Sequence, residues 1–88
     1  MSRTYTIVEK SQKTSAGMGG GWWFVLQGKF DAMAPLSFVG QGGSVVTSKG
    51  PAAIEVADAE LRNGVLSIKL DGVDGHTVGR QALLTLGI

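Results

Sequence analysis

The chain has 88 residues, no cysteine and a formal net charge of +1, from 8 Lys and Arg against 7 Asp and Glu. The absence of cysteine excludes a disulfide framework and a thiolate metal site. The small net charge argues against nucleic acid as a main partner, because phosphate binding needs an excess of basic residues. A single domain over residues 1–88 is expected, and its small core favours association with other proteins as a further source of burial.

Charged residues make up 17% of the chain, against roughly 25% in typical soluble domains. This composition favours a subunit whose faces are partly covered in an assembly. No stretch approaches the roughly 18 apolar residues of a membrane span, and the first ten residues lack the apolar core of a signal peptide. We therefore expect no membrane partner and synthesis in the cytoplasm. Assembly into a virion is compatible with this expectation.

The first third of the chain predicts two strands around a glycine-rich segment. Residues 3–10 alternate in polarity, which is typical of a first strand near a sheet edge. Residues 11–21, SQKTSAGMGGG, carry almost no core-forming side chains and predict a flexible loop or arm. In the strand over 22–30, WWFVLQGKF, adjacent tryptophans must point to opposite sides. We expect Trp22 in the core and Trp23 on a second apolar surface or against a partner.

The rest of the chain predicts further short strands. Residues 36–39 and 44–48 suit a hairpin, and no amphipathic helix is expected. A turn near Asp58 is followed by a second hairpin, in which Asn63 and Gly64 supply the two positive-φ positions of a type I′ turn. Its second strand buries alternate residues over 66–70. A polar loop, DGVDGHTVG, and a last strand with Leu84 and Leu86 on one face complete the chain.

One segment resembles a known family. AELRNGVL, residues 59–66, is similar to the A-x-x-x-N-G-V-L signature of the α-crystallin domain of small heat-shock proteins. YTIVEK resembles the opening strand of that domain, and LLTL, residues 83–86, lies where the family often has an I-x-I-like docking motif. The resemblance implies a sandwich and suggests holdase activity. However, TSKGPAA leaves no room for the long loop with which bacterial members exchange a strand.

The pattern as a whole predicts an all-β fold. About seven short strands separated by glycine-rich turns favour a small antiparallel β-sandwich, immunoglobulin-like or α-crystallin-like, and a small barrel is the other architecture that they allow.

The polar loop contains the residues most suited to chemistry. His76 is the only histidine, and Asp71 or Asp74 could orient it, but no serine lies in a G-x-S-x-G elbow. The same three residues lack the ligand spacing of a calcium loop. GMGGG runs into a strand rather than the helix of a phosphate loop. We therefore expect no enzyme, cofactor or metal site.

The sequence thus favours a non-enzymatic structural or interaction subunit of a larger assembly. The composition is similar to that of small bacteriophage virion proteins, such as capsid-decorating or tail proteins. Protein partners are expected, either further copies in a homo-oligomer or a larger scaffold. The alternative is a miniature holdase chaperone, and a small hydrolase using His76 is least supported. The interface candidates are Met18, Trp23, Val25, Leu84 and Leu86.

Overall fold

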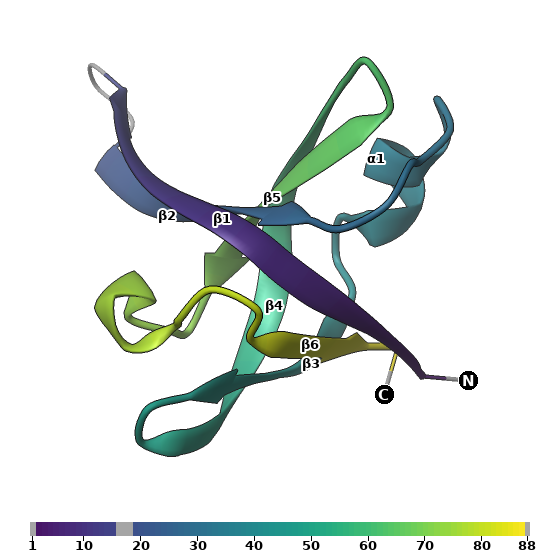
Figure 1. Ribbon diagram of the computed structural model, residues 1–88. Coiled ribbons are helices and arrows are strands. Elements are labelled where there is room, and N and C mark those ends of the chain that lie inside the picture. Colours follow the sequence, from purple (N-terminus) through teal and green to yellow (C-terminus); the bar gives the residue numbers. More distant parts are fainter. Residues whose placement is uncertain (1, 16–18, 88) are drawn as a thin grey trace.

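The computed structural model describes residues 2–15 and 19–87. In this part of the chain six strands and two short helices follow one another (Figure 1). The strands are β1 (Arg3–Ser15), β2 (Gly19–Leu26), β3 (Gly42–Thr47), β4 (Gly50–Arg62), β5 (Val65–Asp71) and β6 (Leu83–Leu86). The helices are α1 (Ala34–Phe38) and the 3₁₀ turn η1 (Gly75–Thr77). Across the described ranges, no helix has the length and apolar character needed to cross a membrane.

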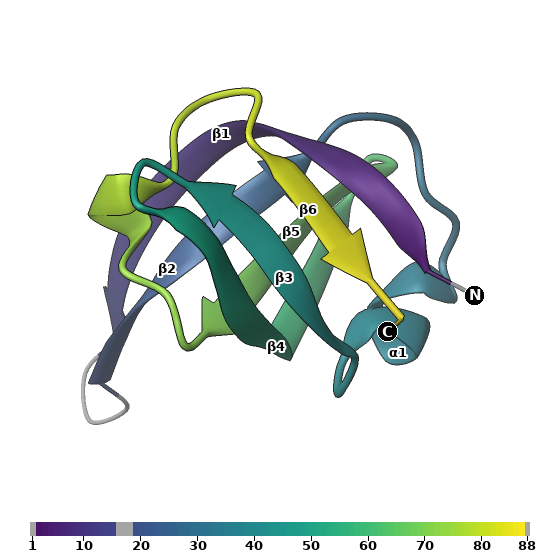
Figure 2. The same ribbon diagram turned by 90° about the horizontal axis from the view of Figure 1, so that it is seen from below.

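The strands form one antiparallel sheet that closes into a barrel in the order β1-β2-β5-β4-β3-β6. The all-β prediction is confirmed, but the sheet is a six-stranded barrel where the sequence favoured a sandwich of about seven strands. Every strand has a neighbour on each side, so β1 is not at an edge as predicted. Figure 2 shows β6 and β3 lying between β1 and β4.

Closure depends on two long strands that each pair with two different neighbours. The first half of β1 pairs with β6 and the second half with β2, while β4 pairs first with β3 and then with β5. Each strand has an irregularity where it changes neighbour, between Ile7 and Glu9 in β1 and between Val56 and Asp58 in β4. A bulge adds one residue and bends the strand. The turn expected near Asp58 is therefore a bend within one continuous strand.

The predicted flexible arm over residues 11–21 is largely a hairpin. β1 and β2 stay in register as far as the pair Ser15 and Gly19, so residues 11–15 and 19–21 are strand. Ladder hydrogen bonds come from the backbone, which explains why few core-forming side chains are needed there. Residues 16–18, with the interface candidate Met18, lie outside the described residues.

A short helix replaces the strand expected over 36–39. The Asp31 carboxylate accepts a hydrogen bond of 2.9 Å from the backbone N–H of Met33, and Pro35 lies in the first turn, where its missing N–H costs nothing. Ala34 and Phe38 are four residues apart and are buried on the same side of α1. The helix packs across one end of the barrel, at the side opposite η1 (Figures 1 and 2).

The barrel interior is filled by alternate residues of the strands. Phe24, Leu66 and Ile68 are fully buried, as their alternation predicts. Asn63 and Gly64 have φ of 51° and 80°, which confirms the positive-φ hairpin turn between β4 and β5. The remaining buried hydrophobic residues are Ile7, Leu26, Ala34, Phe38, Val45, Ile54, Val56, Leu70, Val78, Leu84 and Leu86.

Candidate functional site

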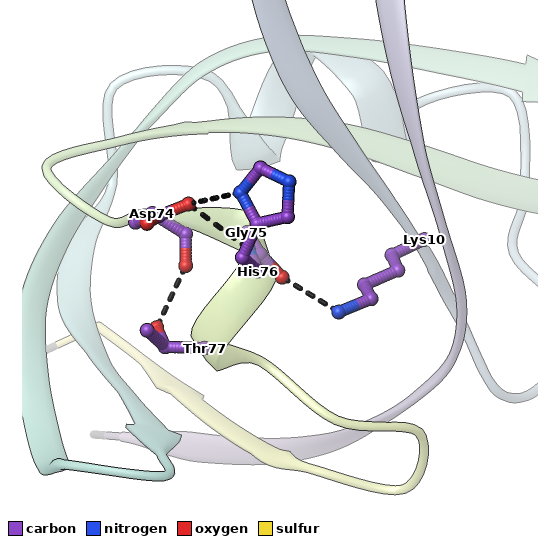
Figure 3. Close-up of polar contacts among 5 residues, drawn as sticks. All are labelled: Lys10, Asp74, Gly75, His76 and Thr77. Atoms are coloured by element: carbon purple, nitrogen blue, oxygen red, sulfur yellow. Dashed lines mark hydrogen bonds and ion pairs between the residues drawn. The ribbon is translucent and has the colours of Figure 1, made fainter.

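The polar loop between β5 and β6 is closed by its own hydrogen bonds (Figure 3). The Asp74 carboxylate accepts from the backbone N–H of His76 at 3.0 Å and lies 2.9 Å from Nδ1 of the same residue. The Thr77 hydroxyl donates to the Asp74 carbonyl at 2.7 Å. The pKa of Asp74 is lowered, first by the backbone N–H of His76 and then by its side chain. Asp74 and His76 therefore hold a turn.

The same loop is fastened to the β1–β2 hairpin. The Lys10 ammonium donates to the Gly75 carbonyl at 2.8 Å and lies 5.6 Å from the ring centroid of Trp22. The Trp22 ring meets His76 edge to face at 4.8 Å, and a Cβ at Gly75 would collide with it. Among the described residues, no three metal-ligating side chains cluster, and Asp71 does not join Asp74 and His76. The loop therefore has a structural role, because its contacts hold it against the β1–β2 hairpin at this end of the barrel.

The interface candidates from the sequence have three different locations. Leu84 and Leu86 are 0% and 1% exposed, so their prediction as interface residues is wrong: β6 points them into the core. Trp23 and Val25 are half-buried on the outside of β2. Met18, as stated above, is not among the described residues. The outward side chains of β6 are Leu83, which is 49% exposed, and Thr85.

Trp23 and Val25 lie on a face that carries both signs of charge. Trp23 is opposite Ser11 of β1 and Lys69 of β5, and Val25 is opposite Glu9. An ion pair of 2.8 Å joins Arg62 and Glu60 on β4. We call this surface the charged face, and its outward residues are Glu9, Ser11, Trp23, Val25, Asp58, Glu60, Arg62, Val65, Ser67 and Lys69.

The opposite side of the barrel carries a face without charge. It is formed by outward residues of β6, of β3, of β1 up to Thr6 and of β4 up to Ala53, and these strands lie side by side (Figure 2). We call it the uncharged face, and its residues are Thr4, Thr6, Ser44, Val46, Pro51, Ala53, Leu83 and Thr85. Half of them carry a hydroxyl and half are apolar.

Strand register arranges the uncharged face in two rows. One row runs Thr4, Thr85, Ser44, Ala53 through directly paired positions. In the second row Thr6 is paired with Leu83, and Val46 is paired with Pro51. Val46 and Leu83 are adjacent: β3 and β6 are antiparallel and Val45 is opposite Leu84, so the residue after Val45 lies beside the residue before Leu84.

The two largest side chains of the uncharged face are strongly exposed. Val46 and Leu83 are 50% and 49% exposed. The hydroxyls of Thr4 and Thr85 are 3.3 Å apart and hydrogen-bonded. The nearest charge along β4 is Glu55, which lies one row further on, opposite Gly42. The sequence does not reveal this face, because the face joins four segments that are distant in the chain.

Comparison with protein-family models, curated proteins and solved structures finds no match to this chain. Function is therefore inferred from the surfaces of the barrel itself.

Proposed function

We propose that this protein is a non-enzymatic structural subunit that associates through its uncharged face, first of all with a second copy of itself. The supporting observation is that eight neighbouring outward positions on four strands carry no charged side chain. In a chain of this size, exposed Val46 and Leu83 at the centre of such a patch fit a contact surface better than a solvated one.

The chemistry of the face suits symmetrical contact. A two-fold interface places the same patch on both subunits, so a charge near the axis faces its own copy. An uncharged patch avoids that repulsion, whereas the charged face would have to desolvate Glu9, Asp58 and Lys69. A threonine or serine hydroxyl both donates and accepts a hydrogen bond, so it can pair with the same residue of a second copy.

The small size of the face predicts weak association. A stable interface takes about 800 Å² and roughly 20–30 residues from each partner, more than the uncharged face supplies. Weak contacts of this kind become effective when several act together, as in a capsid or tail built from many copies. A virion component such as a capsid-decorating or tail protein is the assembly we propose.

Sedimentation velocity with a matched pair of variants tests this proposal. We expect the average mass of the wild type to rise with protein concentration between about 1 µM and 1 mM, the range of weak complexes. Val46→Lys should keep the protein monomeric, because it places like charges against each other. Val65→Lys is the control, since Val65 is 42% exposed on the charged face, and it should associate as the wild type does. A wild type that stays monomeric throughout, or equal loss in both variants, would contradict the proposal.

A client-aggregation assay separates this proposal from a holdase. A holdase needs a promiscuous apolar surface, and the wild type would then suppress aggregation of a reduced, unfolded client at equimolar concentration. We expect no suppression, because a small face half made of hydroxyl groups is suited to one matched partner. Suppression that Val46→Lys removes would assign the same face to client binding.

A further inference from the structure

A groove runs beside α1 at the end of the barrel opposite η1. It consists of two adjoining hollows of about 320 and 260 Å³, which share Arg3, Tyr5, Ser37 and Phe38. The larger hollow extends towards Lys29 and Phe30, and the smaller one extends towards Gln41 and Leu86. Both are open to solvent along one side. The groove lies outside the residues of the uncharged face.

The floor of the groove is aromatic. The ring centroids of Tyr5 and Phe38 are 5.3 Å apart, those of Phe30 and Phe38 are 5.7 Å apart, and those of Tyr5 and Phe30 are 6.2 Å apart. Phe38 is buried in the core, while Tyr5 and Phe30 are half-buried and line the groove. Such a cluster offers a rigid apolar surface for one large side chain of a ligand.

The rim of the groove has an excess of positive charge. Arg3 and Lys29 both line it, and neither forms an ion pair with any carboxylate that the structure describes. Among the residues that the structure describes, Asp31 is the one acidic residue of the lining, and its carboxylate accepts the Met33 N–H at the start of α1. Two exposed cations against one carboxylate favour an anionic ligand.

Three exposed apolar side chains lie on α1 or directly beside it. Met33, Leu36 and Val39 are 64%, 76% and 46% exposed; Leu36 lies in α1, and Met33 and Val39 are the residues directly before and after it. Met33 also lines the larger hollow. The core explains none of these three side chains, since Ala34 and Phe38 are the residues that α1 buries.

We propose that this groove binds an extended segment of a partner protein in which a large apolar side chain is flanked by carboxylates. The aromatic floor takes the apolar side chain, and Arg3 and Lys29 take the acidic neighbours. Small-molecule sites enclose most of their ligand, which hollows open along one side do not do. A peptide in the larger hollow also covers the exposed side chain of Met33. This binding is independent of self-association through the uncharged face.

The test uses a fluorescein-labelled octapeptide with a Leu-Phe pair between two runs of acidic residues. A second octapeptide carries lysine at every acidic position. We expect fluorescence anisotropy to show that the wild type binds the acidic peptide and not the basic one. The double variant Arg3→Glu, Lys29→Glu should weaken binding at least about tenfold, because two attractive contacts become repulsive.

Two controls assign the binding to the groove. The double variant Lys49→Glu, Arg80→Glu makes the same change in net charge at exposed positions outside the groove, and it should change affinity less than about threefold, as expected for long-range charge alone. Val46→Lys should bind as the wild type does. If Arg3→Glu, Lys29→Glu does not fold, as judged by circular dichroism, Lys29→Glu alone replaces it. Equal loss in the two double variants, equal binding of both peptides, or no binding at 1 mM wild type would overturn the proposal.

Discussion

The two long strands β1 and β4 contribute to both faces, to the uncharged face near their starts and to the charged face in their second halves. The first halves of β1 and β4 contribute Thr4, Thr6, Pro51 and Ala53, whereas their second halves contribute several charged residues. The bulge in each strand separates the two halves. Exposed hydrophobic residues occur on both faces, so an exposed valine or tryptophan does not by itself identify an interface. The charge of the neighbours across the strands distinguishes the two faces.

Adjacent leucines of β6 provide the largest test of this comparison. Leu84→Ala should lower the free energy of unfolding by about 2–5 kcal/mol, because Leu84 is fully buried and leaves a cavity. Leu83→Ala should change it by less than about 0.5 kcal/mol, because the side chain is half exposed, but should weaken self-association. Urea denaturation and sedimentation velocity measure the two effects.

The comparison requires that Leu84→Ala mainly lowers the free energy of unfolding and that Leu83→Ala mainly weakens self-association. If Leu84→Ala weakened association as strongly as Leu83→Ala in samples that are fully folded, burial in the core would not explain the role of Leu84. The sequence-based prediction of Leu84 as an interface residue would then regain support.

Neighbouring glycines of β3 test how the uncharged face is built. A Cβ at Gly43 would collide with the Thr85 carbonyl, whereas a Cβ at Gly42 meets only the Ile54 carbonyl, at 3.8 Å. Gly43→Ala should therefore destabilise the barrel by about 1–3 kcal/mol, as overpacking does. Gly42→Ala is the matched control and should be neutral or slightly stabilising, because alanine reduces the freedom of the unfolded chain. If urea denaturation gave the same free energy of unfolding for Gly43→Ala and Gly42→Ala, β3 and β6 could move apart without loss of stability.

The sequence is sufficient to predict the inward residues of β2 and β5, since each is a short strand with strict alternation. In β6 the alternation is also evident, but Leu84 and Leu86 were expected at an interface and are inward instead. The sequence did not reveal the barrel, because closure depends on bulges in two long strands. In β4 the buried positions change from Ile54 and Val56 to the half-buried Ala59 and Leu61, a shift of one residue. That shift is the signal of a bulge, although a turn near Asp58 accounts for it equally well. In α1, five residues are too few to show a helical period.

The proposed binding surfaces are harder to predict from the sequence than the core. The uncharged face collects two outward residues from each of four segments, near positions 5, 45, 52 and 84, and only the strand register brings them together. The groove depends in the same way on α1, which the sequence did not predict. Trp23 is a reasonable interface candidate by size, but the sequence does not show its neighbours across the strands.

The smallest expected effect concerns the loop that locks the hairpin of β1 and β2. In the folded chain the pKa of Asp74 is lowered from 3.8, because the His76 backbone N–H and side chain stabilise its carboxylate. The resulting stability is fully present above pH 3.8 and is lost as the pH falls through the lower, folded-state pKa. Asp74→Asn should therefore reduce the free energy of unfolding at pH 6, and the difference from the wild type should shrink on going to pH 2.5.

A second carboxylate provides the control for that measurement. Asp71 is directly opposite Glu55 in the β4–β5 ladder, so Asp71→Asn removes a like-charge contact and should not lower stability at pH 6. Urea denaturation of the three proteins at both pH values makes the comparison. Equal destabilisation by both substitutions at pH 6 would mean that net charge, and not the turn held by Asp74 and His76, determines the effect. A difference confined to Asp74→Asn would show that this exposed turn helps to keep the loop against Trp22, and with it the half of the barrel that carries the charged face.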